Sequence, residues 1–190
     1  TIGAGIVEKN FLGKGINLDT NFELSEESLK GQIIYSRPNF AYTDNTLFTS
    51  IKSVNSDFLD LYGYETKEIG LSLGTKFEQY ENLFFSPEID FTIEDLTTNS
   101  AASSTIKKQE GSYSDFYFNY GLDYDRRDSS YNAKKGYITS FFQKLPVVSE
   151  NNEISNTLTY TTYKELNKST EMVGRASLYL KAINTFDGSD

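Results

Sequence analysis

The chain has 190 residues and a net charge of −9, and it contains neither cysteine nor histidine. The missing residue types exclude disulfides and thiolate metal sites, and they remove the usual general base of enzymes. The negative charge argues against a nucleic-acid partner, which would select a basic stripe. No apolar run approaches the ~20 residues of a membrane helix, although strands of a membrane barrel leave no such run either. We therefore expect no enzyme, no catalytic residue, no cofactor and no metal site.

Apolar and polar residues alternate with a period of two along most of the chain, which predicts β-strands. Within 83–95, for example, Ile89 and Phe91 fall on one side, and Glu88 and Asp90 on the other. Several of the segments have about the 9–11 residues that a tilted strand needs to cross a bilayer. In chain order, the expected strands are 2–9, 16–24, 29–36, 46–54, 68–77, 83–95, 114–125, 137–147, 157–165 and 172–183.

The connections between these segments alternate in character. Compact ones rich in turn residues are expected at 11–15, 37–45, 79–82, 129–136 and 167–170. Longer, more polar ones are expected at 25–31, 56–67, 96–113 and 148–156. Short turns on one side and longer loops on the other are typical of an outer-membrane barrel.

The alternation alone suits a soluble β-sandwich or a lipocalin-like barrel equally well. Two features favour a membrane barrel instead. Charged residues such as Asp19, Glu23 and Arg175 fall on the polar faces of strands, which suits a water-filled lumen. Aromatic residues such as Tyr80 and Tyr137 lie near the compact turns, where an interfacial girdle is expected. The pattern therefore favours an all-β, antiparallel, up-and-down transmembrane β-barrel.

Three acidic groupings are candidate sites: Asp123 with Asp125, Glu94 with Asp95, and the run at 150–153. Asp123 and Asp125 share a strand face and lie ~7 Å apart, as two carboxylates of an acid–base pair do. The chain has no histidine, and Arg126 and Arg127 follow at once, so we favour a lumen-facing ladder of ion pairs near one rim. The acidic run at 150–153 lacks the glycine-punctuated spacing of a calcium loop, and we expect it to be a solvated loop.

Three stretches resemble the BamA family of outer-membrane protein assembly factors. "EKNFLGKG" (8–15) is similar to a family turn between two early strands, and "SRPNF" (36–40) is similar to the Pro-aromatic turn one hairpin later. "YDRRDSSYNAKKGY" (124–137) resembles the family's Asp-x-Arg-Asp and Pro-x-x-Gly-Tyr motifs, with Ala133 in place of the proline. The positions that carry the likeness are Asn10, Phe11, Leu12, Gly13, Gly15, Pro38, Phe40, Asp125, Arg127, Asp128, Gly136 and Tyr137.

The resemblance implies that residues 1–190 are part of a C-terminal outer-membrane β-barrel domain, with about ten of its sixteen strands. It implies that the parent protein folds and inserts other outer-membrane proteins in a Gram-negative bacterium. The implied partners are unfolded outer-membrane protein clients, accessory assembly lipoproteins and membrane lipid. It also implies that the POTRA modules, the first barrel strand, the last strands and an Arg-Gly-Phe/Tyr loop lie outside these residues.

On the same resemblance, we expect an acidic lumen surface that includes Glu88, Asp115 and Asp123. Three other functions stay open at this point. They are a related two-partner secretion or TamA-like transporter, a passive porin-type barrel whose acidic lumen favours cations, and a soluble β-sandwich binding module.

Overall fold

The computed structural model describes residues 1–149, 152–167 and 171–185. It contains one antiparallel sheet in which each strand pairs with the next one along the chain. The strands are β1 (Ile2–Phe11), β2 (Ile16–Leu24), β3 (Ser28–Arg37), β4 (Thr46–Phe58), β5 (Tyr64–Tyr80), β6 (Leu83–Thr98), β7 (Gly111–Asp125), β8 (Gly136–Val148), β9 (Glu153–Asn167) and β10 (Met172–Thr185). The predicted all-β, up-and-down fold is confirmed.

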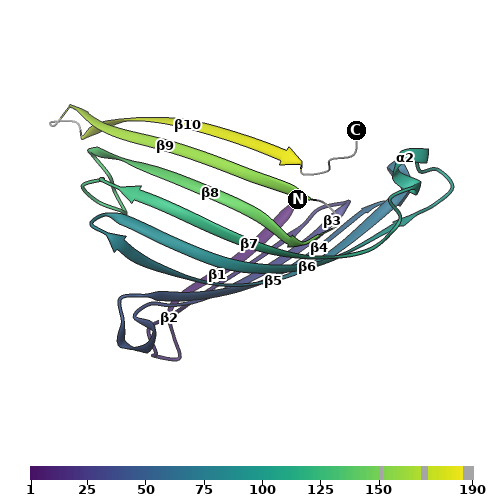
Figure 1. The fold of residues 1–190 in the computed structure, drawn as a ribbon, viewed down its shortest axis with the longest axis horizontal. Helices are drawn as coiled ribbons and strands as arrows, with labels where there is room; N and C mark the ends of the chain where they lie inside the picture. The colour runs from purple at the N-terminus through teal and green to yellow at the C-terminus, as the bar shows by residue number, and fades with distance from the viewer. Residues whose placement is uncertain (150–151, 168–170, 186–190) are drawn as a thin grey trace.

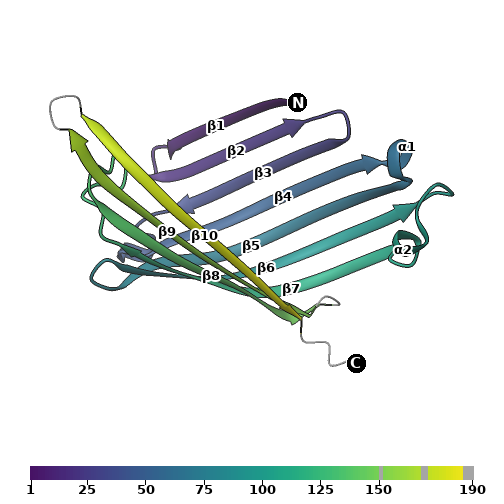
Figure 2. The same cartoon turned by 90° about the horizontal axis from the view of Figure 1, so that it is seen from above.

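The sheet is long and strongly curved (Figures 1 and 2). Among the described strands, the edges of the sheet are β1, which pairs with β2, and β10, which pairs with β9. Three short helices lie in the connections: η1 (Phe40–Tyr42), α1 (Leu59–Tyr62) and α2 (Ser104–Lys107). Within the described ranges, no helix has the length and apolar character needed to cross a membrane.

The strand ends define two rims, which we call the turn end and the loop end. The turn end holds the connections at 12–15, 38–45, 81–82 and 126–135, and the loop end holds 25–27, 59–63 and 99–110. Helices α1 and α2 both lie at the loop end (Figure 2), and their connections are joined by the Asn99 amide, which donates to the Gly63 carbonyl over 2.8 Å. The expected contrast in length is wrong for most connections, because 25–27 and 59–63 are shorter than 38–45 and 126–135.

The predicted difference in connection length is absent because strands β4 to β7 run further toward the loop end than predicted. Residues 64–67 extend β5, and residues 55–58 extend β4. Charged residues such as Lys67 and Asp95 occupy alternate positions there in place of apolar ones, so the apolar signal of a strand is lost. The backbone nevertheless stays paired, with Asn55 opposite Lys67 and Lys67 opposite Asp95.

Two expectations fall partly outside the described residues. The compact turn at 167–170 and the acidic run at 150–153 each include residues that the structure does not describe.

Candidate functional site

The strand register sorts the side chains onto two chemically different faces. One face carries an apolar patch across β5 and β6, whose side chains are 39–60% exposed: Ile69, Leu71, Leu73, Ile89, Phe91 and Ile93. The other face carries the buried polar side chains: Ser72, Thr92, Asp115, Asn119 and Thr161. Side chains crowd together on the concave side of a curved sheet, so we assign the polar face as the inward one.

Aromatic rings follow the outward face near the turn end. Phe77 of β5 contacts Phe85 of β6, with ring centroids 5.7 Å apart. Tyr120 of β7 continues the row, with centroids 6.1 Å from both Phe85 and Phe141. Aromatic side chains that gather near one end of the strands are typical of the girdle at the membrane interface of a barrel.

A second aromatic row lies nearer the turn end, on β7 to β9. Tyr137 has its centroid 6.1 Å from that of Tyr124 and 5.8 Å from that of Tyr160. We call these three residues the tyrosine row. Tyr124 and Tyr160 are 36% and 38% exposed, so the row faces outward at the turn-end rim.

The inward face carries cations as well as carboxylates. Lys52 of β4 forms an ion pair with Glu68 of β5 over 2.6 Å. The Lys144 ammonium of β8 lies 3.5 Å from the centre of the Tyr117 ring on β7. Lys52 is opposite Gly70 and Lys144 is opposite Asn119, which places both contacts on the inward face, on either side of β6. The inward face is therefore a mixed ionic surface.

The three residues expected on an acidic lumen surface share the inward face but do not form one cluster. Glu88 of β6 is opposite Asn119 of β7. Asp115 is 8% exposed, and its Oδ1 has no hydrogen-bond partner among the described residues. Asp123 forms an ion pair with Lys76 over 2.7 Å. Asp115 and Asp123 lie eight residues apart on β7, about 26 Å by strand rise.

The sequence interpretation missed the inward lysines: Lys52, Lys76 and Lys144. Each of these lysines occupies a position that alternates in step with the polar residues of its strand. The period-two pattern of the sequence was therefore enough to predict that they lie on the inward face. The individual pairings could not be found this way, because they depend on which strand lies next to which.

The β7–β8 connection contains the most extensively bonded of the family-like motifs. Nε and Nη2 of Arg127 donate to the two carboxylate oxygens of Asp125 over 2.8 and 2.6 Å. The backbone amide of Arg127 adds a third hydrogen bond to Oδ1 of Asp125, over 3.1 Å. This bidentate geometry holds the start of the connection against the end of β7.

Asp128 orders the rest of that connection. Its Oδ1 accepts hydrogen bonds from the backbone amides of Lys134 and Lys135, over 2.9 and 3.1 Å. The Lys135 amide, with help from that of Lys134, lowers the pKa of the Asp128 carboxyl below its ordinary value. Gly136 has a φ of 94°, and a Cβ there would come within 2.9 Å of the Arg126 carbonyl carbon and the Arg127 Cα, so only glycine fits.

The β1–β2 turn is closed by Asn10. Its carbonyl accepts from the Gly13 amide over 2.8 Å, and its side-chain oxygen accepts from the Gly15 amide over 2.7 Å. Gly13 and Gly15 have φ values of 69° and 67°, and Leu12 has a φ of 56°. Phe11 is the last residue of β1, opposite Ile16. Two glycines therefore occupy left-handed positions that residues with a Cβ resist.

The β3–β4 connection follows Pro38. Asn39 adopts a left-handed φ of 51° and starts η1 at Phe40, whose amide donates to the Asn45 carbonyl over 2.8 Å. The Arg37 guanidinium lies 5.8 Å from the centre of the Phe40 ring. The three family-like motifs thus all lie at the turn end, but on separate hairpins.

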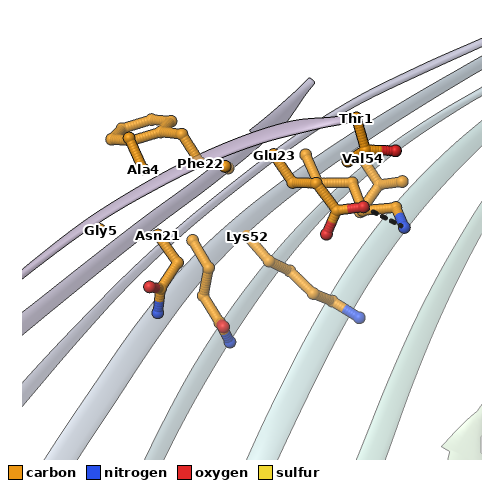
Figure 3. Close-up of a pocket in the computed structure, with 12 residues that line it drawn as sticks. Thr1, Ala4, Gly5, Asn21, Phe22, Glu23, Lys52 and Val54 are labelled. Atoms are coloured by element: carbon orange, nitrogen blue, oxygen red, sulfur yellow. Dashed lines mark ion pairs between the residues drawn. The ribbon is translucent and has the colours of Figure 1, made fainter. Parts of the chain in front are cut away.

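An open hollow of about 810 Å³ lies over the first strands (Figure 3). Asn21 and Lys52 project on one side of the ribbon, whereas Ala4 and Phe22 project on the other. Glu23 and Lys30 form an ion pair over 3.8 Å at its border, and each side chain is about half exposed. Asn21 is opposite Gln32, and Gln32 is opposite Lys52, so these lining residues of the hollow share the polar face.

Among the residues that the structure describes, no three acidic side chains are arranged to hold a metal ion. The inward face instead offers scattered ion pairs and hydrogen bonds, such as Ser50 Oγ to Ser72 Oγ at 2.8 Å. Such an arrangement suits a wet inner wall.

The Omp85 superfamily domain matches residues 10–190. A comparison with curated proteins finds no match. Among solved structures, the chain is similar to BamA from Haemophilus ducreyi lacking POTRA domains 1–3, with a TM-score of 0.74 and 23% sequence identity. The similarity covers 98% of this chain and 38% of that chain, so this chain spans less than half the length of the structure it matches. At this identity the likeness shows the fold, and the superfamily match adds the family: the chain belongs to the Omp85 superfamily, and its strands are part of a bacterial outer-membrane β-barrel.

Proposed function

We propose that the chain forms part of the barrel wall of an assembly factor that folds and inserts other outer-membrane proteins. The observation that carries the proposal is the likeness of almost the whole chain to the fold of a BamA barrel, within a shared superfamily. In this proposal, residues 1–190 belong to a C-terminal barrel domain. Its partners are unfolded outer-membrane clients, accessory lipoproteins and membrane lipid.

The physical task in this proposal needs no bond to be made or broken. An unpaired backbone N–H or C=O group costs several kcal/mol in hydrocarbon, so a client strand must enter the membrane already paired or beside a template. A barrel wall supports this task in two ways. It keeps its own backbone groups hydrogen-bonded inside the membrane, and it separates a water-filled lumen from the surrounding acyl chains. The two-faced sheet of β1 to β10 supports this role, because exposed apolar side chains lie on one face and ion pairs on the other.

Insertion kinetics test the proposal directly. The full-length parent protein is reconstituted in lipid vesicles, and an urea-unfolded outer-membrane barrel protein is added. We expect the client to fold many times faster than in protein-free vesicles or in vesicles with an unrelated porin at equal density. Equal rates in all three preparations would contradict the proposal.

The same vesicles distinguish the passive-barrel alternative. A porin-type barrel with a net acidic lumen would conduct cations in preference to anions, and the chain as a whole has 27 acidic and 18 basic residues. Steady cation-selective conductance without faster client folding would identify a channel. A two-partner secretion transporter would instead move a soluble client across the vesicle membrane.

A further inference from the structure

The outward face of β7 to β10 carries one charged side chain among its described residues. Inward and outward positions follow from the register, in which Thr162 opposes Tyr137 on the outward side and Tyr163 opposes Gly136 on the inward side. By this alternation, Lys144, Arg175 and Lys181 fall on the inward face, and only Lys164 of β9 falls outward. Lys164 therefore places an isolated ammonium on the lipid-facing surface of these strands.

Lys164 lies just past the tyrosine row, toward the turn end. Tyr160, Thr162 and Lys164 are successive outward positions on β9, so the Lys164 Cα lies ~13 Å by strand rise beyond that of Tyr160. Tyrosine rings mark the headgroup level of a bilayer, and lysine stems extend along apolar surface to bring the charge to that level. Lys164 therefore lies where lipid phosphates lie.

A second cation lies at the same rim. Arg126 follows the last residue of β7, and its amide donates to the Tyr137 carbonyl over 2.8 Å, which continues the pairing of β7 with β8. Because Asp125 takes an inward position, Arg126 takes the next outward one. Arg126 and Lys164 are two strands apart, about 10 Å, with an offset of ~7 Å along the strands. Two extended side chains span that separation around one phosphate group.

The three other cations of the β7–β8 connection each have a carboxylate partner, whereas Arg126 and Lys164 have none in the part of the chain that the structure describes. Arg127 pairs with Asp125 over 2.6 Å, Lys134 with Glu171 over 3.3 Å, and Lys135 with Glu165 over 3.3 Å. Among the described residues, no acidic group lies within ion-pair distance of Arg126 or Lys164, and both side chains are exposed. Among the described residues, the β7–β8 connection thus neutralises Arg127, Lys134 and Lys135, whereas Arg126 and Lys164 on the outward side keep their charges unpaired.

We propose that Arg126, Lys164 and the tyrosine row form a binding site for the headgroup phosphate of an anionic phospholipid at the turn-end rim. The two cations hold the phosphate, and the tyrosine rings contact the glycerol and upper acyl region beside it. The occupant is a membrane lipid because the cations continue the lipid-facing surface and do not face the aqueous lumen. The proposal depends on the membrane location of the barrel and not on its assembly function.

Lipid retention on the full-length protein tests the site. The protein is purified in detergent, stripped of lipid and titrated with phosphatidylglycerol, and binding is measured by native mass spectrometry. In the double variant R126Q/K164Q, we expect the dissociation constant to rise about five-fold for each cation removed, or ~25-fold in total. The conservative variant R126K/K164R keeps both charges and should stay within about two-fold of the natural protein.

The matched control is K134Q/K135Q, which removes the same number of charges from the same end of the sheet but from residues already paired with Glu171 and Glu165. It should leave phosphatidylglycerol binding within about two-fold. Glycerol phosphate and the zwitterionic phosphatidylcholine serve as probes and should both bind far more weakly. Equal losses in the two double variants, no loss in R126Q/K164Q, or equally tight binding of glycerol phosphate would each overturn the proposal.

Discussion

Lys76 on β5 and Asp123 on β7 form an ion pair across the intervening strand β6, with 2.7 Å between Nζ and Oδ2. The same ammonium lies 5.4 Å from the centre of the Phe84 ring on β6. One side chain therefore links three adjacent strands on the inward face near the turn end. The Lys76 and Asp123 side chains are 43% and 27% exposed, so water reaches the pair.

This exposure predicts a weak coupling between the two charges. Water screens a pair of this kind, and exposed ion pairs typically couple by less than ~1 kcal/mol. A double-mutant cycle with Lys76→Met and Asp123→Asn, measured by urea unfolding of the membrane-reconstituted parent protein, should return a coupling in that range. A coupling of several kcal/mol would instead mean that the inward face is dry.

The two faces of β6 predict opposite responses to charge. Ile89 is 42% exposed on the outward face, and Arg at this position should cost ~2–4 kcal/mol of folding free energy if it lies near the bilayer midplane. Asp90 lies on the inward face, where its Oδ1 accepts from the Thr92 hydroxyl over 3.0 Å. Asp90→Asn retains an acceptor there and should cost little.

Both variants are compared by the urea midpoint of the reconstituted parent protein. Similar costs at the two positions would mean that the inward and outward faces are assigned wrongly.

Gly136 and Gly13 both adopt a left-handed backbone conformation, but they differ in the space around them. A Cβ on Gly13 meets nothing within 4 Å, so Gly13→Ala should cost only the ~1–2 kcal/mol of the left-handed backbone. A Cβ on Gly136 would overlap the backbone of Arg126, and this backbone cannot move without breaking the Arg126–Tyr137 hydrogen bond. Gly136→Ala should therefore lower the unfolding free energy clearly more than Gly13→Ala, and equal losses would contradict this packing.

The lowered pKa of Asp128 predicts a pH dependence of stability. A carboxyl whose pKa is lower in the folded state stabilises the fold above its unfolded pKa of ~3.9, and that stabilisation disappears as the pH falls through the folded value. Asp128→Ala should therefore lower the thermal midpoint at pH 7, and its difference from the natural protein should shrink progressively below pH ~4. Asp128→Asn keeps an acceptor for the Lys134 and Lys135 amides and serves as the control. A deficit in Asp128→Ala that persists unchanged at low pH would argue against the charge as its cause.

The alternation of the sequence located every strand, because the period of two in a half-buried strand is imposed locally by the pleat. It also assigned residues such as Ile89 and Asp90 to opposite faces, as the register has them. The ends of β4 and β5 at the loop end were missed, because the outward positions there, including Lys67, are polar and only hydrogen bonding to neighbouring strands keeps the backbone extended.

The sequence by itself thus determined the fold class, the strand order and the chemistry of each face, since all three follow from local periodicity and from motifs at short separations. Only the tertiary structure decided which charges meet, such as Lys76 with Asp123 from positions 47 residues apart. It also decided which cations keep no partner, such as Lys164. Ion pairs depend on strand register and sheet curvature, and these arise from contacts between strands that no single strand encodes.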